Sequence, residues 1–206
     1  MRQSELLFSK CDLRVALDGH ERKMYDEIDK LDRRRALETS VEELCDYFEK
    51  EYSVKVPQLD EARIEVNQKD AQVDVRHDPR RAVFDRSRPV YVAGTQISFL
   101  VPFAGDKELF KCRPSSFNFN PPHAIVNETE LVLAYTVIDQ NPEALRAGFD
   151  RDLAQIRQWL SCVENDASQF NNPLRGKVRE RLERRRNKLA RDQELAAGLG
   201  FPVRGT

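Results

Sequence analysis

Hydrophobic residues in the first quarter of the chain recur at the spacing of an amphipathic helix. The first group, at intervals of four and three residues, is Met24, Ile28 and Leu31. The pattern resumes after a run of three arginines with Val41, Leu44, Cys45, Phe48 and Tyr52. Between the two groups, Ser40 and Glu43 form a capping-box sequence, in which a hydroxyl and a carboxylate satisfy free amides at a helix start. Residues 20–52 are therefore predicted to form two helices that divide near Thr39.

From Val54 to Val137 hydrophobic positions alternate along the chain, which is the period of a β-strand. The clearest runs are residues 64–66, 73–75, 97–103 and 131–137. Turn sequences lie between them at residues 77–79, 104–106 and 120–122. Successive short strands without a helical period between them predict an antiparallel meander. Since Pro102 cannot donate a ladder hydrogen bond, its strand is expected to lie at an edge of the sheet or to end there.

The last third of the chain returns to the helical period. Asn141 and Pro142 are typical of a helix start, with asparagine as the N-cap and proline at the first position. The strongest periodic pattern in the chain follows, an apolar seam made of Phe149, Leu153, Ile156, Leu160, Val163, Ala167 and Phe170. Residues 171–173 interrupt it, and a second stripe follows with Leu174, Val178, Leu182, Arg185 and Leu189. Two long helices joined by so short a turn predict an antiparallel hairpin.

These patterns together predict the α+β class. The expected architecture is an antiparallel β-meander or small sandwich packed with a C-terminal antiparallel helical hairpin and preceded by acidic N-terminal helices. We expect an N-terminal helical segment over 1–53, the antiparallel β region over 54–139 and the hairpin over 140–206, with 54–206 as one domain. A chain of 206 residues with 40% hydrophobic content can bury a core, so global disorder is not expected.

The composition favours a cytoplasmic protein. No apolar run approaches the length of a membrane span, and Leu6, Leu7 and Phe8 near the N-terminus are too short a run for a signal peptide. The four cysteines, which form no CxxC pair, are Cys11, Cys45, Cys112 and Cys162. We expect them to be reduced and mostly buried thiols, because a free cysteine behaves as a small hydrophobic residue.

Charge is distributed unevenly along a chain whose net charge is −1. Residues 18–52 carry a net charge of −5, whereas residues 175–191 carry +7. The basic segment is a candidate nucleic-acid contact, with phosphates bound by Arg179, Arg184, Arg185, Arg186 and Lys188. The alternative is that the basic helix forms a solvated face or pairs with the acidic N-terminal helices of the same molecule.

No motif indicates catalysis. A restriction-type nuclease site needs an Asp and a Glu-x-Lys, and neither Asp60 with Glu65 and Lys69 nor the similar group at residues 106–111 has that spacing. The three histidines stand apart, and no esterase, dinucleotide-binding or P-loop motif occurs. We therefore expect no catalytic residue, no metal site and no cofactor. An aromatic cluster, expected to be core unless one face stays exposed, comprises Phe99, Phe103, Phe110, Phe117 and Phe119.

The segment DPRRAVFDRSRPVYVAGTQISFLVPFAGDKELFKCRPSSFNFNPP, residues 78–122, resembles a segment of uncharacterised bacterial proteins. The later stretches QFNNPLRGKVRERLERRRNKLARDQ and LGFPVR extend the resemblance over most of residues 50–204. In those proteins this region looks like an N-terminal module ahead of a restriction-endonuclease-like domain. The resemblance implies bacterial antiphage defence or DNA processing. It carries no catalytic residue onto this chain, and the catalytic portion is expected outside it.

The function expected from the sequence is that of a non-catalytic interaction and assembly module. Its contact would be the apolar seam, packed within one chain or across a symmetric dimer, through Phe149, Leu153, Ile156, Leu160, Val163 and Phe170. Self-association or a protein partner is expected, and no membrane. The alternative function is nucleic-acid binding through the basic C-terminal helix.

Overall fold

The computed structural model describes residues 4–77, 84–117, 120–138 and 141–199. The chain forms two compact units, each built from segments that are distant in sequence. One, here called the sheet unit, comprises residues 1–13 and 56–164. The other, the helical unit, comprises residues 14–55 and 165–206. Each unit is described separately.

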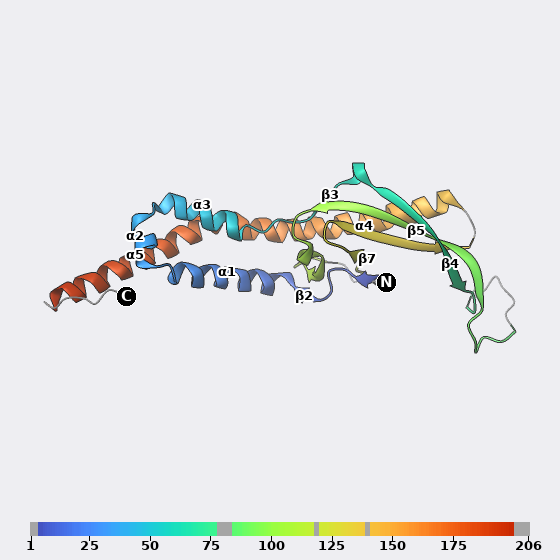
Figure 1. Ribbon diagram of the computed structural model, residues 1–206, viewed down its shortest axis with the longest axis horizontal. Coiled ribbons are helices and arrows are strands. Elements are labelled where there is room, and N and C mark those ends of the chain that lie inside the picture. Colours follow the sequence, from blue (N-terminus) through green and yellow to red (C-terminus); the bar gives the residue numbers. More distant parts are fainter. Residues whose placement is uncertain (1–3, 78–83, 118–119, 139–140, 200–206) are drawn as a thin grey trace. The chain divides into compact units, whose positions relative to one another are not determined.

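An antiparallel sheet forms the sheet unit, in agreement with the α+β prediction (Figure 1). Its strands are β1 (Glu5–Leu6), β3 (Gln58–Leu59), β4 (Glu65–Asp74), β5 (Tyr91–Ala104), β7 (His123–Val126) and β8 (Glu130–Val137). Their order is β1-β7-β8-β5-β3, and β4 also pairs with β5. Two short strands, β2 (Cys11–Asp12) and β6 (Cys112–Arg113), form a separate parallel pair. Two 3₁₀ turns complete the unit, η1 (Glu61–Arg63) and η2 (Lys107–Lys111).

Strand β5 is central, which corrects the expectation drawn from Pro102. That residue lies two positions before the end of β5 and is paired with Glu130 of β8, while β3 and β4 occupy the other side of the strand. The proline is tolerated because the missing amide falls at the end of the strand, where its carbonyl still accepts from the Asp60 amide at 2.8 Å.

The paired strands β4 and β5 continue past the end of β8. Strand β8 pairs with β5 no further than Thr95, whereas β4 pairs with β5 as far as Tyr91. The last four pairs, residues 71–74 with 91–94, therefore form a two-stranded ribbon (Figure 1). Gly94 lies where the ribbon leaves the sheet. A glycine is needed there, because a Cβ would lie 2.6 Å from Val73 Cγ2 and 2.8 Å from the Val137 carbonyl oxygen.

Helix α4 (Pro142–Asn171) covers one face of this sheet, and its residues up to 164 belong to the sheet unit. Its predicted start is confirmed, since the Asn141 side chain accepts a hydrogen bond from the Ala144 amide at 3.0 Å. Phe149 stacks on Phe99 of β5, with ring centroids 4.1 Å apart. Tyr135 of β8 donates its hydroxyl to Asp152 at 2.6 Å, and partial burial together with this bond raises the pKa of the tyrosine.

The N-terminal segment packs into the same core. Phe8 stacks on Trp159 of α4 at a centroid distance of 5.2 Å and contacts Phe110 at 6.0 Å. Both Leu7 and Phe8 are fully buried. Short as β1 is, the first residues of the chain are thus part of the sheet unit rather than of the helices that follow them.

Helices make up the helical unit. They are α1 (Leu13–Asp29), α2 (Arg33–Glu38), α3 (Val41–Tyr52), the end of α4 and α5 (Leu174–Gly198). Three N-terminal helices therefore replace the predicted two, because a short extra helix fits between residues 32 and 39. The predicted capping box is confirmed at the start of α3, where Ser40 and Glu43 exchange hydrogen bonds. The core comprises Met24, Ile28, Leu31, Ala36, Leu44, Cys45, Phe48, Tyr52, Phe170, Leu174, Val178, Leu182 and Leu189.

Helices α4 and α5 form a bent pair, not the predicted antiparallel hairpin. Pro173 adopts right-handed helical dihedral angles (φ −83°, ψ −3°), and its carbonyl accepts from the Lys177 amide at 3.0 Å. The turn therefore bends the helical path without reversing it. In the helical unit α5 packs against α3 and α2. The apolar stripe of α5 was predicted correctly, but it faces the N-terminal helices.

The two compact units divide the chain differently from the expected boundaries at 53/54 and 139/140. The first thirteen residues join the sheet, and α4 contributes residues to both units. Hydrophobic periodicity identifies elements along the chain but carries no information about which elements share a core. That is the physical reason for the difference.

Two of the four cysteines are joined, which corrects the expectation of four reduced thiols. Cys11 and Cys112 form a disulfide between β2 and β6, with their Cα atoms 4.5 Å apart. Cys45 is buried and free, and Cys162 is partly exposed and free. The bonded pair is separated by 101 residues, so spacing alone could not reveal it.

Candidate interaction surfaces

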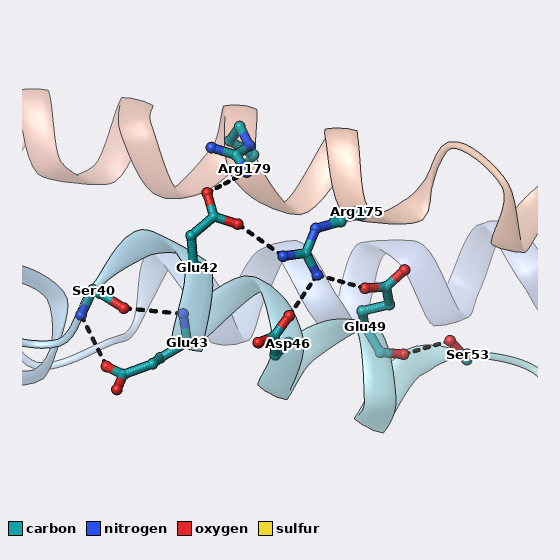
Figure 2. A network of polar contacts seen from close by, with 8 residues as sticks. All are labelled: Ser40, Glu42, Glu43, Asp46, Glu49, Ser53, Arg175 and Arg179. Carbon is teal, nitrogen blue, oxygen red and sulfur yellow. Dashed lines mark hydrogen bonds and ion pairs between the residues drawn. The ribbon is translucent and has the colours of Figure 1, made fainter.

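The basic helix α5 is anchored to α3 by one arginine that contacts three carboxylates. Arg175 donates from Nη1 to Asp46 at 2.6 Å and to Glu49 at 2.8 Å, and from Nη2 to Glu42 at 2.8 Å (Figure 2). These hydrogen bonds, led by the one to Asp46, raise the pKa of Arg175 above its ordinary range. The three acidic residues lie on one face of α3, three or four positions apart, which is the helical spacing for neighbours.

Further ion pairs extend this contact along α5. Arg179 pairs with Glu42, and its hydrogen bond, followed by the one from Arg175, lowers the pKa of that carboxyl. Arg181 donates from Nε to Asp29 at 2.9 Å, which raises the pKa of the arginine. The basic and acidic helices of the unit therefore pair with each other, as one of the two sequence-based alternatives proposed.

A second polar cluster joins α1 to α5. Lys177 lies 2.9 Å from Glu21, whose carboxylate also accepts the Tyr25 hydroxyl at 2.5 Å. Partial burial acts to raise the pKa of Glu21, but the hydrogen bonds from Tyr25 and Lys177 outweigh it, so the pKa lies below its ordinary value. Burial and the bond to Glu21 raise the pKa of Tyr25 to about 12.

Most of the residues suggested as nucleic-acid contacts have partners inside the helical unit. Arg184 pairs with Glu180 on its own helix, and Arg179 pairs with Glu42. Arg185 donates to the Leu31 carbonyl at 2.9 Å. Arg186 donates from Nε to the Ala36 carbonyl at 2.7 Å and from a second nitrogen to the Thr39 carbonyl. The last two arginines thereby satisfy carbonyls near helix ends, where intrahelical partners are missing.

Lys188, the fifth suggested contact, is exposed, and no hydrogen bond or ion pair joins it to a described residue. Four of the five side chains would have to leave their present partners to reach a phosphate. Sequence alone could indicate the opposite charges of the two regions, but it could not show which carboxylates and carbonyls the arginines contact.

The apolar seam is buried within the chain. In the sheet unit its buried members are Phe149, Leu153, Ile156, Leu160 and Val163, and in the helical unit they are Ala167 and Phe170. These side chains fill the two cores. Of the two arrangements considered for the seam, packing inside one chain accounts for its burial.

The aromatic cluster is mainly core. Phe99, Phe103 and Phe110 are buried in the sheet unit. Phe117 is 42% exposed, with the Arg113 guanidinium 4.9 Å from its ring centroid. Phe119 lies outside the described residues.

No metal-binding cluster is found in the part of the chain that the structure describes. The described residues contain no group of three or more His, Cys, Asp or Glu side chains that could hold a metal ion. A pocket of about 460 Å³ in the sheet unit is lined by three lysines and three glutamates, but they pair off as Lys10–Glu5, Lys107–Glu128 and Lys111–Glu108. In the two nuclease-like groups of residues, Asp60 pairs with Arg63 and Glu108 with Lys111.

An open sheet edge is a feature that the sequence did not indicate. The Val75 amide donates to the Val90 carbonyl at 2.8 Å, so odd-numbered residues of β4 direct their backbone groups toward β5. Even-numbered residues, among them Gln68 and Gln72, therefore direct theirs away from it. No hydrogen bond from another described residue reaches these outward groups. All ten residues of β4 are exposed or partly exposed, and among the described strands β4 is the longest one at an edge of the sheet.

Comparisons with protein-family models, curated proteins and solved structures found no match to this chain. Among the described residues, no helix combines the length and apolar character that crossing a membrane requires.

Proposed function

We propose that this chain is a non-catalytic interaction and assembly module whose sheet unit binds an extended segment of a protein partner along β4. The observation that carries the proposal is the outward row of backbone groups on that strand. Such a row is a template for strand addition, in which backbone hydrogen bonds supply affinity and alternate side chains supply specificity.

The charges on β4 favour a different chain over a second copy as the occupant. Two β4 strands related by a two-fold axis pair antiparallel, with one residue opposite its own counterpart. The two registers of greatest overlap place Lys69 opposite Lys69 or Asp70 opposite Asp70. Like charges directly opposite destabilise a strand pair. Self-association through this edge is thereby opposed, while a partner strand of complementary charge is not.

The resemblance to modules that precede a nuclease-like domain fits this proposal. A strand-binding edge could fix the position of an effector in a bacterial defence assembly without taking part in catalysis. Binding of nucleic acid through α5 is less well supported, because four of its five suggested contacts already have intramolecular partners.

The disulfide bears on the compartment. Bonds of this kind persist in oxidising environments and are rare in cytosolic proteins. For the cytoplasmic location expected from the sequence, a reduced Cys11–Cys112 pair is the usual state, and labelling of thiols before and after lysis measures it.

Photo-crosslinking from the edge tests the proposed function. A photoreactive residue at Gln68 of the full chain, in the cells that naturally express it, is expected to crosslink to an extended segment that peptide mass spectrometry identifies. The additional change Gln72→Pro is expected to abolish the product, because it removes an outward donor while leaving the β4–β5 ladder intact. The control is a photoreactive residue at Ala134, an exposed position on β8. Equal products from both positions, or a product that survives Gln72→Pro, would contradict the proposal.

A further inference from the structure

We infer that the end of the β4–β5 ribbon, through Phe84, Arg86 and Arg88, contacts double-stranded nucleic acid. This site is separate from the β4 edge and from helix α5. It does not depend on the proposed protein partner, and it involves a part of the molecule to which the sequence assigned no role.

Arg86 and Arg88 are exposed, and neither forms a hydrogen bond or ion pair with a described residue. Most arginines of the basic helix, by contrast, contact carboxylates or backbone carbonyls, and among the described residues of that helix Arg191 is the exception. Guanidinium groups that are free and solvated can bind phosphate oxygens without first breaking an internal contact.

The nearby carboxylates of Asp74 and Asp85 accept hydrogen bonds from other residues of this region. Asp74 accepts from the amides of Arg76 and Val90 at 3.1 and 3.2 Å and from Arg76 Nε at 2.7 Å. Desolvation acts to raise the pKa of Asp74, but these hydrogen bonds outweigh it and lower the pKa. Asp85 accepts from the Ser87 amide at 2.8 Å, and bonds from the Ser87 hydroxyl and amide lower the pKa of its carboxyl. Neither carboxylate pairs with Arg86 or Arg88.

Aromatic side chains accompany the free cations. Phe84 is fully exposed, at 105% of its reference area, and Tyr91, the first residue of β5, is 60% exposed. Large apolar side chains left in water next to unpaired cations are typical of a contact surface. In proteins that bind bent DNA, apolar side chains of this kind insert between base steps while cations hold the backbone.

Shape favours nucleic acid over an anionic membrane. The major groove of B-DNA admits a two-stranded β-ribbon, which is the geometry that residues 71–74 and 91–94 form. Because the whole chain has a net charge of −1, its overall field does not attract DNA, so binding would depend on this local site.

A salt titration of duplex binding tests the inference. The purified full chain is mixed with a short fluorescent DNA duplex of mixed sequence, and anisotropy is followed across a range of salt concentrations. The double change Arg86→Gln/Arg88→Gln is expected to weaken binding and to reduce the slope of log K against log salt by about 1.8, or about 0.9 for each phosphate that is no longer bound. Phe84→Ala is expected to weaken binding without changing that slope.

The matched control removes the same charge from the helical unit. Arg22 and Arg191 are also exposed, without a partner among the described residues, so Arg22→Gln/Arg191→Gln should leave both affinity and slope unchanged. Fluorescence of Trp159, the single tryptophan, verifies that each variant is folded. Three results would overturn the inference: no binding by the unchanged protein, equal losses in the two double variants, or binding that depends on Arg86 and Arg88 to phosphatidylserine vesicles but not to the duplex.

Discussion

The two units of this chain are held together by different means. In the helical unit, α5 has four buried apolar residues along its length, and ion pairs to α1 and α3 surround them. In the sheet unit, stacked aromatic rings fill the space between α4 and the sheet, and a disulfide fixes the N-terminal segment. An arginine-rich sequence can thus form an internal surface, while Arg86 and Arg88, which have no partner among the described residues, lie on a ribbon of the other unit.

This contrast implies different responses to conditions. Ion pairs between partly exposed side chains weaken as salt rises or as carboxylates become protonated. Burial of apolar rings responds little to either. The following variants separate the two contributions, and they are ordered by the size of the expected effect.

The largest loss is expected from the aromatic core of the sheet unit. Phe149 is 1% exposed and stacks on Phe99, so Phe149→Ala should lower the free energy of unfolding by about 4 kcal/mol. Urea denaturation followed by Trp159 fluorescence measures this, since that residue belongs to the same unit. The control Phe84→Ala, at a fully exposed position, should change the value by no more than about 0.5 kcal/mol. Similar values for the two variants would contradict the packing described for Phe149.

The disulfide comes next. Replacing Cys11 and Cys112 by serine should cost about 3 kcal/mol, the middle of the typical range for a disulfide, because the bond between these distant residues restricts the unfolded chain. Thiol titration of the unfolded, unreduced protein should find two groups, Cys45 and Cys162, and four after reduction. Finding four thiols without reduction would show that the pair is not bonded.

A smaller effect, and one that depends on salt, is expected in the helical unit. Arg175→Gln removes contacts to three carboxylates, so hydrogen exchange in α3 and α5 should become faster at low salt. The difference from the unchanged protein should shrink at high salt. Arg34→Gln is the control, because its single described pair with Glu38 is largely exposed. Equal effects of the two changes would show that the contacts of Arg175 add little stability.

Acid should weaken the same contacts. Because Arg179 and Arg175 hold the pKa of Glu42 below its ordinary value, its contribution is complete above the pKa of the unfolded chain, about 4.3. It is lost as pH falls through the lower pKa of the folded state. Hydrogen exchange of α3 between pH 6 and 3, in the unchanged protein and in Glu42→Gln, measures this contribution, and the pH dependence should be shallower in the variant.

Local patterns were predicted well because they depend on neighbouring residues. Alternation along residues 97–103 and 131–137 correctly predicted strands β5 and β8, and the spacing of the seam correctly predicted a buried face on α4. The hairpin prediction was wrong because a short Asn-Asn-Pro link is compatible with both a reversal and a bend. Choosing between them requires knowing that α5 buries its stripe against α3.

The candidate surfaces were harder to predict because they depend on strand order and on long-range pairing. The sequence of β4 is more polar than those of β5 and β8, as is common for an edge strand, but polarity alone does not give the order of the strands. The pairing of Cys11 with Cys112 and of Arg175 with Glu42 links residues more than 100 positions apart. Opposite net charges suggested the second pairing in general terms, and they could not distinguish it from a surface that binds nucleic acid.

The smallest predicted effect concerns the capping box at the start of α3, which depends on hydrogen bonds between neighbouring residues. The Ser40 hydroxyl accepts from the Glu43 amide at 3.1 Å, and the Glu43 carboxylate accepts from the Ser40 amide at 3.2 Å (Figure 2). Ser40→Ala should therefore cost about 1 kcal/mol, measured by circular dichroism during urea denaturation. Glu43→Gln should cost less, because glutamine can also accept the reciprocal bond. If Ser40→Ala leaves the free energy of unfolding unchanged, the serine hydroxyl does not cap α3 in solution.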